Sequence, residues 1–173
     1  MMEIKMITPE TKADLLLENE PFEIRGRMIV LRTRDEWQYE VALFDETSLM
    51  TFPNEAYDYN ELIKNGFCLG AYMDGTCVGL AIMQNDWFKY MFLYDLKVNH
   101  QYRKHGIGKK LIEAAYRLAK ERDYDGIYTI GQDNNLNACQ FYLNSGFVIG
   151  GYNTQGYRHT SQEDKADIYF YMD

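Results

Sequence analysis

Three apolar runs in the middle of the chain, separated by turn residues, predict the successive strands of a meander. FCLGAYM (67–73) is followed by Asp74-Gly75, a pair typical of a tight hairpin turn. TCVGLAIMQN (76–85) and KYMFLYDLKV (89–98) come next and are rich in residues that suit strands. The middle of the chain therefore reads as antiparallel sheet.

After residue 98 the apolar pattern changes to a helical period. A helix over 107–122 is predicted by apolar residues at helical spacing: Ile107, Leu111, Ala114, Ala115, Leu118 and Ala119. GIYTI (126–130) predicts a strand and residues 136–144 a short helix stopped by Gly146. FVIGGYN and ADIYFY (166–171) predict two closing strands.

The first third of the chain predicts two further helices and a strand pair. Residues 10–20 read as a short helix, and 55–65 as a helix ending near Gly66. Residues 22–32 suit a strand with which 37–44 could pair. The whole order predicts an α/β fold with a mixed, mostly antiparallel central sheet flanked by helices, in one domain of residues 1–173.

Composition indicates a folded, acidic protein. The 173 residues are 46% hydrophobic and 15% aromatic, with fifteen tyrosines, which describes a globular chain and not a disordered one. Eighteen Lys and Arg stand against 26 Asp and Glu, giving a net charge of −8. This charge disfavours nucleic-acid binding and favours cationic substrates, so an anionic cofactor needs a local basic site.

Neither a metal site nor a membrane segment is expected. The odd number of cysteines and the scattered histidines fit no disulfide framework or metal cluster: Cys68, Cys77, Cys139, His100, His105 and His159. No apolar run reaches transmembrane length, and the first dozen residues lack the apolar stretch of a signal peptide. We therefore expect a soluble, cytoplasmic protein without a membrane partner.

The most informative segment is VNHQYRKHGIGKKLI, residues 98–112. It carries the pattern R-x-x-G-x-G between a predicted strand and a predicted helix, with Gly106 and Gly108 where a backbone can approach phosphate oxygens. Unpaired N–H groups at a helix N-terminus suit a pyrophosphate. Four basic residues lie close by: Arg103, Lys104, Lys109 and Lys110. The segment fits neither a dinucleotide fingerprint nor a Walker loop.

This segment resembles the acetyl-CoA pyrophosphate loop of the GNAT superfamily of N-acetyltransferases. A second stretch, Asn135-x-x-Ala138-x-x-Phe141-Tyr142-x-x-x-Gly146-Phe147, is similar to the second cofactor motif of that superfamily. The two motifs occur in the expected order, about 30 residues apart, with the expected helix and strand between them. The resemblance implies an enzyme that moves an acetyl group from acetyl-CoA to an amine, by direct transfer and without a metal.

The resemblance also implies roles for individual residues. The backbone of Leu96 and Val98 would pair with the pantetheine arm of acetyl-CoA, and Asn135 would hydrogen-bond to it. Tyr142 would protonate the leaving thiolate, as a phenol can; the alternative is that Tyr142, like Phe141, is a core aromatic. The pyrophosphate would lie against Arg103 and the amides of the loop: Lys104, His105, Gly106, Ile107 and Gly108.

Over roughly residues 21–171 the chain looks like streptothricin acetyltransferases. The segments that carry this likeness are PFEIRGRM (21–28), YDY (57–59), DGTCVG (74–79), QDNNLNACQFY (132–142), SGFVIGGYN (145–153) and ADIYFY (166–171). The likeness implies acetylation of an amine on the β-lysine arm of a streptothricin antibiotic, and hence antibiotic resistance. An acidic, tyrosine-rich protein suits such a polycation.

The chain departs from these relatives at acidic positions. They tend to carry an acidic pair where this chain has Tyr94-Asp95, and Glu-Thr where it has Ile130-Gly131. Carboxylates at these positions would hold a cationic amine or relay its proton. Asp58, Asp95 or Tyr152 could compensate for their loss.

Asp95 is the best side-chain candidate for the base that accepts the proton of the amine. Alternation along the strand places Tyr94 with Leu96 and Val98 on one face and Asp95 on the other. A water chain ending on a backbone carbonyl is equally open, while His100 and His105 read as solvent or cofactor contacts. Cys139 reads as a packing residue and not as an acyl-carrying nucleophile.

Other functions stay open at this stage. The acceptor could be another small amine, a polyamine or a protein amine, or the chain could be a non-catalytic acyl-CoA-binding protein. The expected partner is a small, cationic amine, with no nucleic acid; a homodimer is left open.

Overall fold

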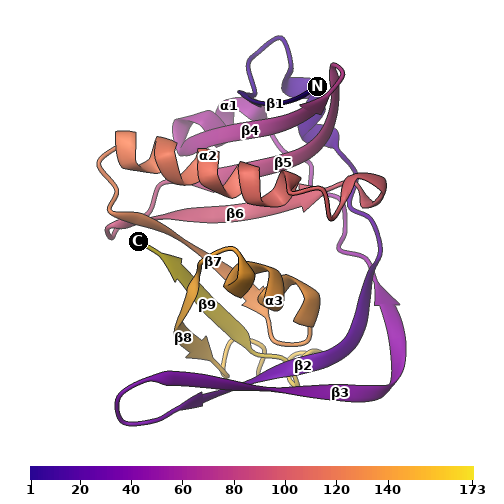
Figure 1. The fold of residues 1–173 in the computed structure, drawn as a ribbon, viewed down its shortest axis with the longest axis vertical. Helices are drawn as coiled ribbons and strands as arrows, with labels where there is room; N and C mark the ends of the chain where they lie inside the picture. The colour runs from indigo at the N-terminus through magenta and orange to yellow at the C-terminus, as the bar shows by residue number, and fades with distance from the viewer. The chain divides into compact units, whose positions relative to one another are not determined.

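The computed structural model describes residues 1–173, which divide into two compact units. The first unit comprises Met1–Glu20, Phe52–Ile127 and Asp173, and the second comprises Pro21–Thr51 and Tyr128–Met172. In chain order the elements are β1 (Met2–Met6), the 3₁₀ helix η1 (Lys12–Leu16), β2 (Phe22–Arg32), β3 (Trp37–Met50), α1 (Tyr59–Lys64), β4 (Gly66–Met73), β5 (Thr76–Gln84), β6 (Tyr90–Val98), the 3₁₀ helix η2 (His100–Tyr102), α2 (Ile107–Glu121), β7 (Gly126–Gln132), α3 (Leu136–Asn144), β8 (Val148–Asn153) and β9 (Asp167–Met172), as Figure 1 shows.

The first unit is built on four strands in the order β1-β4-β5-β6, each pair antiparallel. The turn between β4 and β5 places Asp74 at φ 48° and Gly75 at φ 84°, the left-handed pair that a two-residue hairpin needs. β4 and β5 are buried along most of their length because helices cover both faces of this sheet.

Helix α2 covers one face and the short helices η1 and α1 cover the other. The buried residues of α2 form one stripe, at Ile107, Leu111, Ile112, Ala115 and Ala119, and the helix packs on β4, β5 and β6. On the opposite face Leu15 of η1 and Leu62 of α1 join a core cluster with Leu80 and Ile82 of β5. None of the helices in the structure is long and apolar enough to span a bilayer.

Strand β6 contains a β-bulge at Tyr94 that exchanges the two faces of the strand. Leu93 pairs with Met83, and Asp95 pairs with Ile82, so Tyr94 is the extra residue. Leu93 and Met83 lie in the fully buried core. Without the bulge Asp95 would share their face; with it, Asp95 lies on the face that η1 and α1 cover.

The second unit holds the last strands, helix α3 and a long hairpin. β9 and β8 pair antiparallel, with β7 next to β9. α3 packs on β8, β9 and β2. β2 and β3 form a separate two-stranded sheet whose register shifts between Ile24 and Gly26. β2 buries Met28 and Val30, whereas β3 is exposed along nearly all of its length.

Most predicted elements are confirmed, with four differences. Residues 22–32 and 136–144 form a strand and a helix with the predicted bounds. Only Lys12–Leu16 of the predicted N-terminal helix is helical, and the helix predicted over 55–65 begins at Tyr59. β3 extends to Met50, and β1 was missed: this short strand is fixed by its pairing with β4, which its own five residues do not signal.

Candidate active site

The loop between β6 and α2 turns through two left-handed residues. Lys104 has φ 64° and Gly106 has φ 77°. A non-glycine residue in this region costs roughly 1–2 kcal/mol, so the shape of the loop is imposed by its surroundings. Left-handed residues in a turn bring successive N–H groups into a concavity that suits an anion. This is the geometry expected of the predicted phosphate-binding loop.

The N-terminus of α2 leaves room for a ligand in front of it. Gly106 is the N-cap residue, and no side chain caps the helix. The first N–H groups of a helix have no acceptor within the helix. A Cβ built at Gly106 would meet no heavy atom within 4 Å. The site therefore offers backbone donors and open space, which fits the pyrophosphate of acetyl-CoA.

Two side chains of the loop fold back on the backbone before it. The Nε of Arg103 donates to the carbonyl oxygen of Val98 at 2.8 Å, and His105 Nδ1 lies 3.2 Å from the carbonyl oxygen of Tyr102. Arg103 thus braces the end of β6 while its charge stays beside the loop. His100, expected as a solvent or cofactor contact, lines a cleft of about 540 Å³ in the first unit, together with Leu16, Leu17, Glu18, Glu20, Asn99 and Gln101.

The backbone groups of Leu96 and Val98 point away from β5. The N–H of Asn99 bonds to the carbonyl of Val78, and Val98 and Leu96 pair with Gly79 and Ala81. Hydrogen-bonded and non-hydrogen-bonded pairs alternate in an antiparallel ladder, so both residues fall in non-hydrogen-bonded pairs. Their polar groups are thus directed to the other edge of β6, as the predicted pairing with pantetheine requires.

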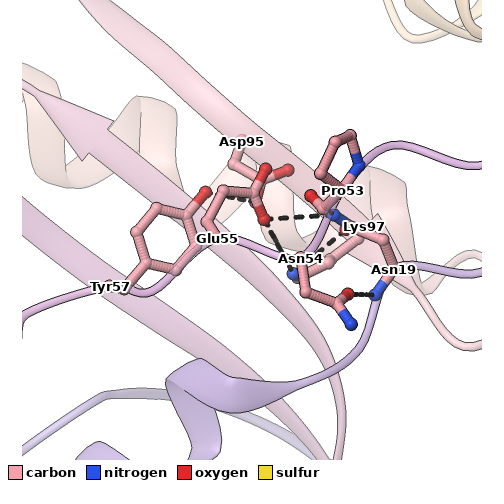
Figure 2. A network of polar contacts seen from close by, with 7 residues as sticks. All are labelled: Asn19, Pro53, Asn54, Glu55, Tyr57, Asp95 and Lys97. Atoms are coloured by element: carbon pink, nitrogen blue, oxygen red, sulfur yellow. Dashed lines mark hydrogen bonds and ion pairs between the residues drawn. The ribbon is translucent and has the colours of Figure 1, made fainter.

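On the other face of β6 Asp95 belongs to a buried polar network, shown in Figure 2. The hydroxyl of Tyr57 donates to Asp95 Oδ2 at 2.7 Å. The ammonium of Lys97 lies 3.8 Å from Asp95 Oδ2 and 3.8 Å from Glu55 Oε2, and 5.8 Å from the centre of the Tyr57 ring. The side chains of Asp95 and Lys97 are only 18% and 13% exposed.

Asn19 connects this network to the chain segment after β3. Its side-chain oxygen accepts from Lys97 Nζ at 3.2 Å, and its Nδ2 donates to the carbonyl of Pro53 and to Glu55 Oε2. Its backbone N–H donates to Asn54 Oδ1 at 2.7 Å. The segment that precedes β2, which contains Asn19, is therefore hydrogen-bonded to the segment that follows β3, which contains Pro53 to Glu55. Both segments also contact Lys97 of β6.

Burial dominates the ionisation of Asp95. Removal from water raises the pKa of this carboxyl group, against the opposing effects of the Tyr57 hydroxyl and the Lys97 ammonium. The pKa of Tyr57 is raised by burial and by the charge of Asp95, so the phenol stays a proton donor to the carboxylate. Asp95 is thus a carboxylate held by a hydrogen bond and a cation, with a proton affinity above its usual value, which suits a general base.

The prediction for Tyr94 was wrong. Leu96 and Val98 do lie on the face opposite Asp95, but the bulge interrupts the alternation at Tyr94. The ring of Tyr94 packs edge-on against Tyr57, with centroids 6.4 Å apart, and is 46% exposed. Tyr94 therefore accompanies the Asp95 network and not the backbone edge of Leu96 and Val98.

Asn135 and Tyr142 lie in the second unit, on α3. Asn135 is the N-cap of α3, with Oδ1 accepting from the Ala138 N–H at 3.4 Å, which leaves its Nδ2 as the group that can donate to a carbonyl. Tyr142 is 9% exposed, and its ring lies 5.4 and 5.5 Å from those of Phe170 and Phe147. The core thus fixes the direction of this side chain, while its part in catalysis stays a prediction.

Cys139 has the environment of a packing residue. It is fully buried, and burial raises the pKa of its thiol to about 12. Its Sγ lies 3.3 Å from the carbonyl oxygen of Gln132, as a thiol donor would. A thiol that is so hard to ionise is a poor nucleophile. No group of three or more His, Cys, Asp or Glu side chains is placed to hold a metal ion.

The other positions singled out from the sequence have local explanations. A Cβ at Gly131 would lie 3.1 Å from Phe170 Cε2 and 3.3 Å from Cys139 Sγ, so glycine here lets these side chains of β9 and α3 approach β7 closely. Asp58 caps α1 by accepting from the Glu61 N–H at 3.0 Å. In the second unit, burial and the charge of Asp133 raise the pKa of Tyr152. Asp95 alone of the three compensating candidates joins a network of acids and tyrosines on β6.

Sequence reasoning missed Glu55, Lys97 and Asn19. The available signal was the pair Asp95 and Lys97, two residues apart on a strand and hence on one face. Asn19 and Glu55 lie far from them in sequence and carried no such signal.

Comparisons with known proteins show which proteins this chain is similar to. Residues 34–147 match the model of the acetyltransferase (GNAT) family. The chain is 28% identical over 169 residues to streptothricin acetyltransferase A of Bacillus subtilis, covering 97% of this chain and 98% of that protein. It is 31% identical over 109 residues to streptothricin acetyltransferase of Escherichia coli, covering 62% and 63%. A structure described as a streptothricin acetyltransferase of Bacillus anthracis in complex with acetyl coenzyme A superposes with a TM-score of 0.87, at 28% identity, covering 99% of this chain and 98% of the other.

Gly106→Val tests the phosphate-binding loop. The added side chain would project into the open space in front of α2, and we expect CoA binding to weaken by about 2 kcal/mol or more, roughly 30-fold. Gly75→Val is the matched control, since Gly75 also has positive φ and open space around it but lies in the β4–β5 turn. Calorimetric titration with CoA separates the two; unchanged affinity in folded Gly106→Val would contradict the assignment.

The pH dependence of the reaction tests Asp95. The base must be ionised, so kcat/KM should rise with pH through the pKa of Asp95, and Lys97→Met should move this rise to higher pH because a stabilising cation is lost. Asp95→Asn should abolish the rise and lower kcat. Folding raises the pKa of Asp95. The contribution of Asp95 to the free energy of unfolding is therefore present at low pH and is lost as the pH rises through the pKa of Asp95 in the folded state. Retention of the wild-type profile in Asp95→Asn would place the base elsewhere.

Proposed function

This chain belongs to the acetyltransferase (GNAT) family and is an acetyl-CoA-dependent acyltransferase, and on that premise we propose that it acetylates a primary amine of a streptothricin-type antibiotic. The observation that carries the proposal is the similarity to proteins named streptothricin acetyltransferases over nearly the full length of the chain. The family alone supports an acetyltransferase; the length of this similarity supports the acceptor.

On the donor side, backbone groups supply most of the contacts. The amides of Lys104–Gly108 hold the pyrophosphate, and the outward-facing polar groups of Leu96 and Val98 align the pantetheine arm. Asn135 donates an additional hydrogen bond to that arm through its Nδ2. Bound acetyl-CoA supplies an activated acetyl group on its thioester sulfur. Because strand β6 and helix α2 fix the strand-edge groups and the loop amides of the first unit, these groups orient the donor without rearrangement.

On the acceptor side, the Asp95 network recognises and deprotonates the amine. Asp95 and Glu55 outnumber the one cation between them, Lys97, so the network attracts an ammonium. Tyr57 and Tyr94 add aromatic faces for cation–π contact. An ammonium has no lone pair for the attack on the thioester, so Asp95 must take one proton before the N–C bond can form.

The departing CoA thiolate needs a proton, and Tyr142 is the residue to which we assign it. The phenol is fixed by Phe147 and Phe170, and it can donate one proton to a nearby anion. The ammonium loses two protons in becoming an amide. Asp95 takes the first before the N–C bond forms and later releases it to water. When the C–S bond breaks, the thiolate takes a proton from Tyr142, and the second proton of the amine nitrogen restores the phenol, so one proton is released overall.

Tyr142→Phe tests this assignment. The ring and its packing are preserved, so the fold and the affinity for CoA should be unchanged, while kcat should fall by up to about 10²-fold. Steady-state rates against acetyl-CoA concentration give kcat, and thermal unfolding checks the fold. A mutant with the wild-type kcat would leave Tyr142 as a packing residue alone.

The identity of the acceptor is tested by measuring the rate at which acetyl-CoA releases CoA thiol in the presence of different amines: a streptothricin, a polyamine and a peptide with a free N-terminus. We expect activity with the streptothricin. We also expect kcat/KM to increase in the double variant Tyr94→Glu with Ile130→Glu, since each added carboxylate should strengthen the binding of a substrate ammonium by about 1.5 kcal/mol or more. Tyr94→Gln with Ile130→Gln is the uncharged control. Activity confined to the polyamine or the peptide would overturn the antibiotic as substrate, and none with any amine would favour an acyl-CoA-binding role.

A further inference from the structure

Strand β3 has one strand neighbour in this chain. It pairs with β2 in a two-stranded sheet, seen in Figure 1 as a long ribbon, and its other edge has no strand beside it. Pairing is regular from Trp37 to Leu43, opposite Gly26–Arg32, and the register then shifts. The regular segment therefore presents a straight row of outward backbone N–H and C=O groups.

The same segment exposes an apolar face that β2 buries. Tyr39 pairs with Val30 and Val41 with Met28, so these side chains share one face of the hairpin. Met28 and Val30 are 0% and 6% exposed, whereas Tyr39, Val41 and Leu43 are 47%, 42% and 66% exposed. One continuous apolar face is thus covered on β2 and uncovered on β3.

The regular segment of β3 has few of the features that keep strand edges from pairing. Between Trp37 and Met50 there is no proline, lysine or arginine. Its charged residues are Glu40, Asp45 and Glu46. Of these only Glu40 falls within the regular segment, where its side chain points to the face opposite Tyr39 and Val41. A second strand can therefore approach this edge.

We propose that β3 is the dimerisation strand of this protein, and that a second copy of the chain pairs with it antiparallel around a twofold axis at Val41. In this register Val41 lies opposite Val41 of the second copy, and Tyr39 lies opposite Leu43 of the second copy. Glu40 lies opposite Ala42 of the second copy, so no like charges oppose each other across the regular segment. The interface is isologous and closes at two chains.

The charges and the apolar side chains of β3 together select this register. Cross-strand partners must share a face, so the axis passes through a residue and not between two. An axis at Glu40 would place the two Glu40 carboxylates opposite each other, and an axis at Leu43 would place Glu40 opposite Glu46. The axis at Val41 avoids both. An axis at Ala42 would also keep like charges apart, but it would place Tyr39 opposite Asp45, whereas the axis at Val41 matches the three apolar side chains with one another.

A groove beside the strand would receive the second copy. The groove has a volume of about 400 Å³ in the second unit, and Trp37, Tyr39, Phe147 and Val148 are among its lining residues. Val148 is 63% exposed there. Because Tyr39 lies opposite Leu43 of the second copy, that leucine would enter the groove and cover its apolar wall. This inference does not depend on which amine the enzyme acetylates.

Light scattering on the full chain tests the proposal. Wild type should have a mass of twice 20.4 kDa, and Val41→Glu should halve it, because two carboxylates would then face each other at the axis. Leu31→Glu is the matched control: Leu31 is equally exposed, at 41%, but lies on β2 and pairs with Gln38, on the opposite face. It should remain a dimer. Circular dichroism and thiol release from acetyl-CoA show whether each variant is folded.

Mixing Val41→Glu with Val41→Lys tests the register itself. Each variant should be monomeric alone, and an equal mixture should regain the mass of two chains, because the introduced carboxylate and ammonium meet only if position 41 opposes itself. A monomeric wild type would overturn the proposal, and would leave the β3 edge to a peptide partner. A dimer that survives in Val41→Glu, or one lost equally in Leu31→Glu, would also overturn it.

Discussion

The β-bulge at Tyr94 is the constraint on which the arrangement of the site depends. One extra residue in β6 moves Asp95 and Lys97 away from the face on which Leu93 packs against Met83. A carboxylate and an ammonium in that apolar core would cost far more than a local irregularity in the ladder. On the face they occupy instead, Tyr57, Glu55 and Asn19 satisfy both charges.

In the proposed reaction, strand β6 thereby serves both substrates. Its side chains after the bulge form the acidic network, while the backbone of Leu96 and Val98 is directed away from β5 and toward the position expected for the donor. The strand then runs into the loop whose left-handed residues, Lys104 and Gly106, precede α2. The amphipathic helix α2 is anchored on the same sheet, so the loop is held at both of its ends.

Local signals made much of this predictable. Gly106 and Gly108 in a strand–loop–helix context predicted the phosphate-binding loop. The period of the apolar residues predicted α2, and a short helix stopped by Gly146 was predicted for α3, both close to their observed bounds. The bulge was not predictable, because nothing in YMFLYDLKV marks where the ladder gains a residue, and the placement of Tyr94 failed for that reason. The contacts of Asn19 and Glu55 with Lys97 join segments distant in sequence, which single-sequence patterns do not report.

Amide hydrogen exchange in the presence and absence of CoA tests most directly whether this loop is the acetyl-CoA site. Backbone N–H groups that donate to a pyrophosphate should exchange more slowly when the ligand is bound. The account predicts slower exchange at Lys104–Gly108 and unchanged exchange at the β4–β5 turn, Asp74-Gly75. Slowed exchange elsewhere, with no change from Lys104 to Gly108, would contradict it.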